Sequence, residues 1–265
     1  AYEQFQLPQY LYIYLINTSI NEKETKVITP EGMNLSNGYS LDKDKWMKTT
    51  TQDNNKDSIY TYTDQIRIII PEDRKTGVVY AAMSTVPITV NYTGTNVADA
   101  TFSLGTEAKD KESEALKNLY SSPYNLNNAK GDYYGTVSDY SSNSPYINMV
   151  LYHVASKLDV QWNVDASVQD KVKLSQIKLT GLSSGGKLFK PLENTTPVST
   201  YDETFTPDEG SQWYGRKATY VIPVKTGSDY LFPMTLTNSV NNSDKPTTAK
   251  ATPPATANAI FVPWI

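Results

Sequence analysis

The sequence predicts an all-β protein with one short helix, arranged as two tandem β-sandwich domains. Many short apolar and β-branched runs are separated by turn signals, which is typical of β-sandwiches. The longest run, residues 149–165, alternates apolar and polar side chains, and only one stretch of the chain has a helical composition. We expect residues 1–165 to form the N-terminal domain, which contains the helix, and residues 166–265 to form the C-terminal domain.

The alternating run is the stretch around which the rest of the chain is organised. Apart from Ser156, every second side chain is apolar, namely Val150, Tyr152, Val154, Leu158, Val160, Trp162 and Val164. This period of two predicts a strand with one face on a core. At about 3.3 Å per residue the run would measure roughly 50 Å, longer than a usual strand. We therefore expect that it spans a whole sandwich or bends at a bulge near Ser156.

The strands of the N-terminal half begin with a run that is apolar on both faces. Residues 10–16 predict a central strand covered on both sides, with residues 26–29 as a partner. Residues 30–58 are polar and loop-like, and Asn37 and Gly38 are a strong turn signal within them. Further strands are expected at residues 59–70, with Ile66, Ile68 and Ile70 on one face, at residues 78–83 and at residues 88–92.

The helix is predicted at residues 107–121, which are rich in Glu, Lys, Ala and Leu and end before Pro123. Its apolar side carries Ala115, Leu116 and Leu119.

In the C-terminal half, Leu174 lies at an even position and Ile177 at an odd position, so they would face opposite sides of a regular strand, which predicts a bulge or break in that strand. Further strands are expected at residues 187–189, 200–205, 218–224, 230–237 and 260–265, and residues 239–258 predict a long low-complexity loop.

The composition excludes several classes of protein. The chain has 265 residues, a formal net charge of −4 and no basic stripe, which disfavours nucleic acid as a partner. It has no cysteine, so neither disulfides nor thiolate metal sites can form. No apolar run reaches the length of about 18 residues that a membrane span needs. The start at Ala1, with a strand by Tyr10, is typical of a trimmed mature form.

No catalytic constellation stands out in the sequence. His153, the only histidine, lies near Lys157 and Asp159 and could be a general base, but we interpret it as a surface or interface residue. Ser175 and Ser184 each precede a lysine by three residues, as in penicillin-binding enzymes. That chemistry needs the serine at the start of a buried helix, and neither serine has such surroundings. We therefore predict no enzyme activity, no catalytic residues and no cofactor.

Oxygen ligands for a cation are scattered through the polar loop of the N-terminal half. Asp42, Asp44, Asp53 and Asp57 could hold Ca²⁺, but they lack the spacing of an EF-hand. Lysines flank Asp42 and Asp44 and would oppose a cation. We interpret this stretch as a solvated loop and predict no metal site.

Two sets of apolar residues are candidates for recognition. Trp46, Trp213 and Tyr214 lie in or near loops and could stack on sugar rings, or they could cover sheet edges. The C-terminal segment carries Ile260, Val262 and Trp264 on alternate positions. It could close the sheet of its own domain, or it could be donated to the open edge of a partner.

The order of these elements resembles the fimbrillin-like proteins, the type V pilus subunits with their anchor and accessory relatives. The resemblance is carried by residues 10–17, 62–71 and 76–82, the helix, the turn Gly131-Asp-Tyr-Tyr-Gly135 and residues 153–160. In the family the last of these strands has Val-Ala-Lys, whereas here Ser156 precedes Lys157. The first arginine, Arg67, lies inside a predicted strand, which departs from the processing site of shaft subunits and favours an anchor or accessory subunit.

The resemblance implies two transthyretin-like, Greek-key β-sandwich domains and no catalytic residues. It implies export as a lipoprotein to the outer membrane of a Gram-negative bacterium, cell adhesion, and assembly into a fimbria by donor-strand exchange. The expected partners are other pilus subunits and a host or bacterial surface protein or glycan, and the membrane is reached only through a lipid anchor outside this chain. The alternative is a secreted glycan-binding β-sandwich module.

Overall fold

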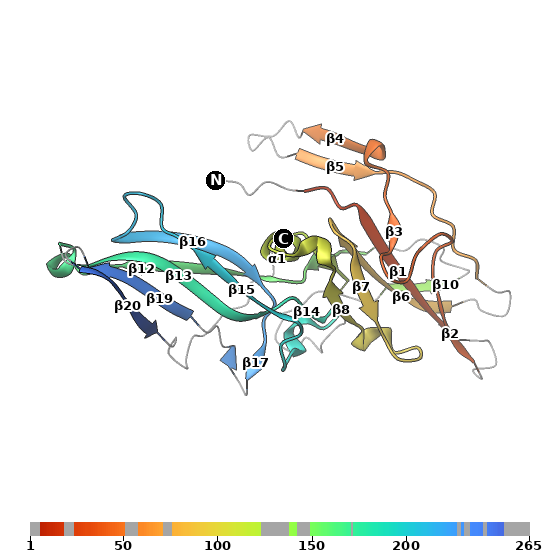
Figure 1. The fold of residues 1–265 in the computed structure, drawn as a ribbon. Helices are drawn as coiled ribbons and strands as arrows, with labels where there is room; N and C mark the ends of the chain where they lie inside the picture. The colour runs from red at the N-terminus through yellow and green to blue at the C-terminus, as the bar shows by residue number, and fades with distance from the viewer. Residues whose placement is uncertain are drawn as a thin grey trace. The chain divides into compact units, whose positions relative to one another are not determined.

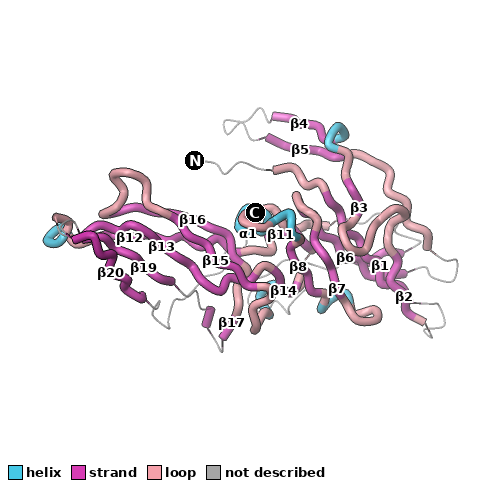
Figure 2. Tube along the Cα trace, viewed as in Figure 1, coloured by secondary structure: helices cyan, strands magenta, loops and turns pink. Residues whose placement is uncertain are grey.

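The computed structural model describes residues 6–18, 24–50, 58–70, 76–122, 138–141, 149–170, 172–226, 229–230, 234–240 and 243–251. Antiparallel strands dominate these residues, with one short α-helix among them (Figure 2), so the predicted all-β class is confirmed. They form two compact units. The first contains the described residues up to Val154 together with Lys187–Lys190, and the second contains the rest from Ala155 onward. The predicted boundary after Asp165 and the transthyretin-like topology stay predictions.

The main sheet of the first unit is built around β1 (Tyr10–Thr18), which was predicted to be a central strand. β1 pairs antiparallel with β6 (Thr76–Ser84) over most of its length (Figure 1). Its other edge pairs with β3 (Tyr39–Ser40) near its start and with β2 (Thr25–Ile28) near its end. The side chains of β1 are buried on both faces, as the sequence suggested, with Tyr12 and Tyr14 on one face and Leu11 and Leu15 on the other.

The same sheet continues beyond β6 through short strands from later in the chain. β9 (Tyr120–Ser121) pairs with one end of β6 and with β11 (Tyr152–His153), and β10 (Ser138–Ser141) pairs with the other end of β6. The helix α1 (Glu112–Lys117) is shorter than predicted, because a 3₁₀ turn at Thr106–Ala108 precedes it and β9 follows it. The predicted apolar residues are buried, Ala115 and Leu116 within the helix and Leu119 just after its end.

A second sheet of the first unit is formed by β7 (Ile88–Asn91) and β8 (Thr101–Leu104), which pair antiparallel. The last residue of β14 (Gly185–Lys187) begins a segment, residues 187–190, that also belongs to this unit. Within that returning segment Leu188 and Phe189 are fully buried. The backbone N–H of Leu188 donates to the carbonyl of Ala100 at 3.0 Å, and the hydroxyl of Ser121 donates to the carbonyl of Leu188 at 2.7 Å.

A separate hairpin completes the first unit. After the 3₁₀ turn Lys43–Lys45, β4 (Trp46–Thr50) pairs antiparallel with β5 (Ser58–Tyr62) and with no other strand among the described residues (Figure 1). The predicted strand at residues 59–70 is therefore wrong in its second half, since residues 63–70 join no sheet. The side chains of residues 66–70 still alternate between half-buried and exposed, as their sequence pattern suggested.

The second unit packs a small sheet against a larger one. β12 (Ser156–Asn163) pairs with β16 (Tyr214–Val221), and the larger sheet has the order β15-β13-β19-β20. The bounds of these four strands are Thr200–Phe205, Val172–Ser183, Met234–Val240 and Ser243–Ala251. The apolar core between the two sheets contains Val160 from β12, Leu174 and Ile177 from β13 and, at its margin, Leu158, Trp162 and Phe205.

Two expectations for the second unit are confirmed, the expected bend in the run at residues 149–165 is found, and the loop expected at residues 239–258 is wrong. The pairing of β13 with β19 shifts register between Leu174 and Gln176, which is the predicted bulge, and β15 has the predicted bounds. The run at residues 149–165 is not one strand, because the chain bends at the buried residues Val154 and Ala155, close to the expected bend. The loop predicted at residues 239–258 contains β20, whose Pro246 lies at the register shift in its pairing with β19, where the ladder is interrupted.

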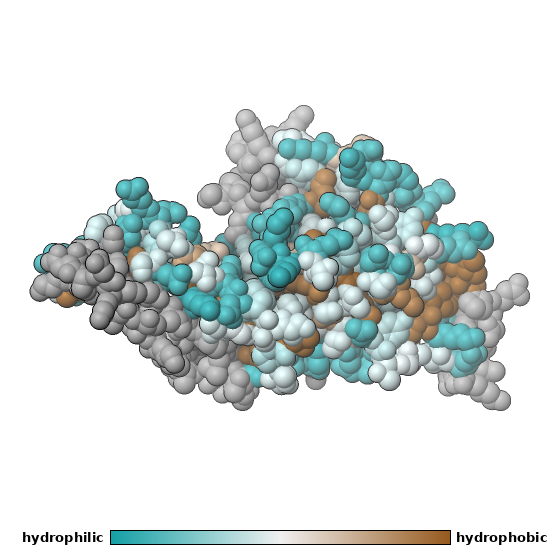
Figure 3. Space-filling model, viewed as in Figure 1, coloured by the Kyte–Doolittle hydropathy of each residue, from teal (hydrophilic) through white to brown (hydrophobic). Residues whose placement is uncertain are grey.

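Shorter elements complete the described chain. They are the 3₁₀ turns Val97–Asp99, Ala166–Val168 and Pro191–Glu193 and the strand pair β17 (Lys225–Thr226) with β18 (Asp229–Tyr230). The face drawn in Figure 3 is mostly hydrophilic or neutral, with small groups of apolar residues and one larger apolar area at the right. Among the described residues, no helix combines the length and the apolar character that a membrane crossing requires.

Candidate functional site

The outer face of the β12–β16 sheet presents a set of exposed polar side chains and one exposed aromatic ring. The ladder pairs Gln161 directly with Arg216 and Asn163 directly with Tyr214, and all four side chains are exposed. Tyr214 is 69% exposed, which is unusual for a ring of this size. Because directly opposite residues in an antiparallel pair lie side by side, these four groups form one contiguous surface.

A charge pair borders this surface. The Nε of Arg216 donates to Oδ1 of Asp159 at 2.9 Å, and the Nη2 of Arg216 contacts Oδ2 of the same carboxylate. Two parallel contacts of this kind fix the plane of a guanidinium group. The pair therefore presents further N–H donors and carboxylate lone pairs in a defined orientation, with little net charge.

An open hollow of about 680 Å³ lies over these residues. It is lined by Gln161, Trp162, Asn163, Tyr214, Gly215 and Arg216. The indole of Trp162 lies against the backbone of Gly215, where a Cβ atom would come within 2.8 Å of Cε2 of the ring. Its Nε1 donates to the carbonyl of Ser211 at 2.8 Å. The ring is therefore held in place on the core-facing side of the sheet, opposite to the exposed side chains of Gln161, Asn163, Tyr214 and Arg216.

Trp213 is anchored to the protein backbone. Its indole N–H donates to the carbonyl of Gln169 at 2.9 Å, and its side chain is only partly exposed. Of the two neighbouring aromatic residues that the sequence proposed for stacking, Tyr214 is therefore the one that presents its ring to solvent. The role of Trp213 in stacking stays a prediction.

The backbone of the β12–β16 sheet has two outer edges that pair with no other strand among the described residues. Val164 donates to the carbonyl of Trp213, its directly opposite residue, at 2.6 Å. In an antiparallel ladder such bonded pairs alternate with pairs whose N–H and C=O groups point away from each other. The amides of Gln161 in β12 and Ala218 in β16 therefore point to the two outer edges.

Trp46 lies in the first unit, at the start of the β4–β5 hairpin. Its ring packs against that of Tyr62, with centroids 5.1 Å apart and planes tilted by 56°. A hollow of about 390 Å³ beside it is lined by Gln6, Leu7, Pro8, Gln9, Lys43, Trp46 and Tyr60. Nζ of Lys48 lies 5.8 Å from the centroid of the Tyr60 ring, a weak cation–π contact. Trp46 is half-buried by these neighbours, so it both packs the hairpin and borders the hollow.

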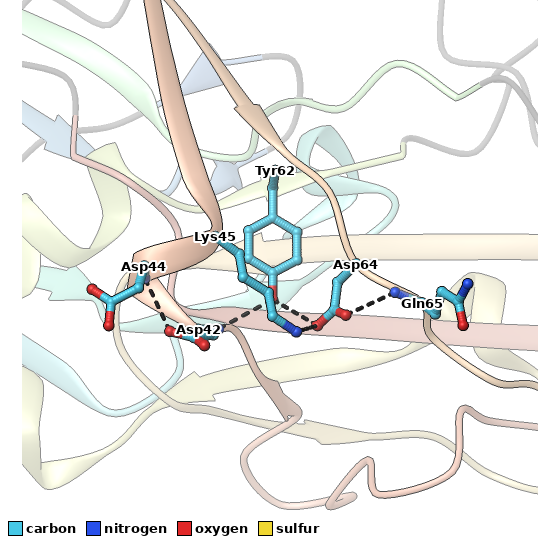
Figure 4. A network of polar contacts seen from close by, with 6 residues as sticks. All are labelled: Asp42, Asp44, Lys45, Tyr62, Asp64 and Gln65. Atoms are coloured by element: carbon cyan, nitrogen blue, oxygen red, sulfur yellow. Dashed lines mark hydrogen bonds and ion pairs between the residues drawn. The ribbon is translucent and has the colours of Figure 1, made fainter.

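A polar network holds the base of this hairpin (Figure 4). The hydroxyl of Tyr62 accepts from the N–H of Asp42 at 3.1 Å and donates to Asp64 at 3.2 Å, and Nζ of Lys45 lies 2.8 Å from the same carboxylate. The hydrogen bond from Lys45 lowers the pKa of Asp64 and raises the pKa of Lys45. Desolvation raises the pKa of Tyr62. These contacts are structural, since they join the 3₁₀ turn before β4 to the end of β5.

The residues considered for catalysis have structural partners. Nδ1 of His153 lies 2.9 Å from the carbonyl of Lys117, and its ring packs on Tyr120 with centroids 4.6 Å apart. The hydroxyl of Ser184 donates to the carbonyl of Ser199 at 2.6 Å. Ser175 lies in β13, and the lysine three residues later pairs with a carboxylate of β15. Neither serine lies in a helix, so the arrangement of the penicillin-binding enzymes is not formed.

The proposed cation ligands of the N-terminal loop do not converge where they are described. Asp42 caps a 3₁₀ turn by accepting from the N–H of Asp44 at 2.9 Å. In the described part of the chain no three acidic or histidine side chains come close enough to hold a metal ion. Asp53 and Asp57 lie outside the described residues, as do the turn at residues 131–135 and the proposed donor-strand residues Ile260, Val262 and Trp264.

The sequence did not indicate Gln161, Asn163 or Arg216 as site residues. For Gln161 and Asn163, the only local signal was their place among the polar residues of the alternating run. That pattern indicates a solvent-facing side of the strand but does not indicate which strand pairs with it.

Comparison with known proteins gives no further assignment, because no protein-family model matches the sequence and no curated protein matches it at a significant level.

Proposed function

We propose that the chain is an anchor or accessory subunit of a bacterial fimbria, which acts in adhesion on the outer membrane and joins its partners by β-strand exchange. One observation carries the proposal: the β12–β16 sheet covers an apolar core with only two strands, and both of its outer edges lack a strand partner in the described part. An added strand would satisfy the outward N–H and C=O groups and bury alternate side chains. The resemblance of residues 10–17, 62–71 and 76–82 to fimbrillin-like proteins points the same way.

Such an addition would be directional. A strand donated by one subunit and accepted by the next makes a head-to-tail contact, which extends into a filament instead of closing a dimer. The C-terminal segment with Ile260, Val262 and Trp264 has the alternating apolar pattern that a donated strand needs. The amides of Gln161 and Ala218 mark the two edges at which it could be accepted.

The test is an outer-membrane extract of the producing cells, run unboiled beside boiled and probed with an antibody to this chain. The proposal expects high-mass bands that collapse to the monomer on boiling. Ala218→Pro and Gln161→Pro each remove one outward N–H, and proline at an edge leaves the β12–β16 ladder intact. Ala218→Ser and Gln161→Ser are the matched controls. Loss of the high-mass bands in one proline variant alone would identify the accepting edge, and a monomer band in both wild-type lanes would overturn the proposal.

A further inference from the structure

We propose that the outer face of the β12–β16 sheet is a binding site for a neutral saccharide, with Tyr214 as the stacking ring and Asn163, Gln161 and the Arg216–Asp159 pair as the polar partners. The inference deepens the adhesive role proposed above and rests on it, because it names the class of ligand that the subunit would hold.

The aromatic part of the site is the exposed ring of Tyr214. A sugar presents one face of C–H groups, and these pack on an aromatic face that water covers poorly. Tyr214 is 69% exposed, and its position in β16 lies directly opposite Asn163 of β12. A ring fixed on a strand offers such a face at little cost in conformational entropy.

The polar part of the site matches hydroxyl groups, which both donate and accept hydrogen bonds. The amides of Asn163 and Gln161 each carry a donor group and an acceptor atom. The guanidinium of Arg216 adds donors that its two contacts to Asp159 do not use, and the carboxylate of Asp159 adds acceptor lone pairs. All of these groups border the hollow of about 680 Å³ beside Tyr214 or contact a group that does.

The charges of this face select a neutral ligand. Arg216 is the charged residue that lines the hollow, and Asp159 compensates its charge through two contacts. An acidic sugar would have to displace Asp159 from the guanidinium, whereas a neutral sugar bonds to both without separating them. Charge complementarity therefore favours a neutral saccharide over an acidic one.

The experiment titrates the purified full chain by calorimetry with lactose, cellobiose, maltose and diacetylchitobiose as neutral probes and with sialyllactose as the acidic probe. We expect binding of at least one neutral disaccharide. Tyr214→Ala should weaken it by about tenfold or more, Tyr214→Phe should retain it because the ring face is kept, and Asn163→Ala should weaken it. Trp46→Ala is the control and should leave the affinity unchanged.

Three results would overturn the inference: no binding of any neutral probe, binding of sialyllactose alone, or binding that Trp46→Ala abolishes and Tyr214→Ala does not. The titration uses the isolated chain, whereas strand exchange is read from the outer-membrane extract. A failed titration with intact high-mass bands would therefore reject the saccharide site only, and the reverse result would reject the assembly role only.

Discussion

Two buried tyrosines on the same face of β1 make a matched pair for measuring the energetic effect of a hydroxyl group. Tyr12 and Tyr14 are both fully buried, two residues apart on one strand. The hydroxyl of Tyr12 accepts from the N–H of Ile88 at 2.8 Å and donates to the carbonyl of Ile88 at 3.0 Å. The hydroxyl of Tyr14 has no hydrogen-bond partner among the described residues, and its ring packs edge-on against Tyr92 with centroids 5.6 Å apart.

Removing these two hydroxyls should change the stability of the first unit in opposite directions. Tyr12→Phe deletes two hydrogen bonds and leaves the polar groups of Ile88 unsatisfied, which should cost about 2 kcal/mol. Tyr14→Phe deletes a hydroxyl that is buried without a partner, a burden of roughly 1–3 kcal/mol, so the variant should be more stable than the wild type by about 1 kcal/mol. The difference between the two variants is then about 3 kcal/mol.

Urea unfolding measures this difference, read by hydrogen exchange in peptides that cover residues 10–18 so that the first unit is followed by itself. Midpoints multiplied by the common slope give the free energies of unfolding. If Tyr14→Phe loses as much stability as Tyr12→Phe, the hydroxyl of Tyr14 has a partner and the reasoning fails.

The same burial predicts how the first unit responds to alkali. Desolvation raises the pKa of Tyr12 to about 12 and that of Tyr120 to about 12, and it raises the pKa of Tyr14 further in the same direction. Because the folded pKa exceeds the unfolded value of 10.0, the unfolded chain loses these protons first. The stabilising effect is complete below pH 10 and is lost as the pH rises towards 12. Absorbance at alkaline pH should show these phenols ionising only on unfolding, and their titration near pH 10 with the fold intact would contradict the assignment.

Three further substitutions test other parts of the fold. Gly215→Ala would push a methyl group into the ring of Trp162 and should cost about 1–3 kcal/mol by urea unfolding, so an unchanged midpoint would show that the ring is free to move. Val160→Asp would bury an unpaired charge in the core of the second unit and should cost about 3–5 kcal/mol, and wild-type-like melting would reject the register of β12. Tyr62→Phe should loosen the base of the hairpin, because Asp64 loses a donor, and faster limited proteolysis there is the expected result, with an unchanged rate arguing against the network.

Local sequence pattern was sufficient for elements whose side chains decide their structure. β1 was predicted because its residues are apolar at both odd and even positions, so neither side of the strand suits solvent. The inner face of β12 was predicted because Leu158, Val160 and Trp162 alternate with polar residues. β20 was not, because its Thr, Lys and Ala residues have no such pattern and its strand conformation comes from backbone pairing with β19.

The candidate site was predicted only in part for a related reason. Tyr214 was found as an aromatic residue near a loop, but the pairing that places it beside Asn163 joins residues about fifty positions apart in the chain. Periodicity gives the face on which a residue lies and says nothing about which strand lies next to it. The partners of Tyr214 could therefore be named only once the register was known.

The return of residues 187–190 to the first unit has a consequence for how the chain matures. Leu188 and Phe189 are buried in the first unit, whose other described residues end at Val154. A chain that emerges from its N-terminus, during synthesis or export, cannot complete the core of that unit until residue 190 has emerged. The first unit must therefore wait, partly open, while the first strands of the second unit appear. Truncation after Val154 would leave a gap in the core of the first unit, so removing the second unit would also destabilise the first.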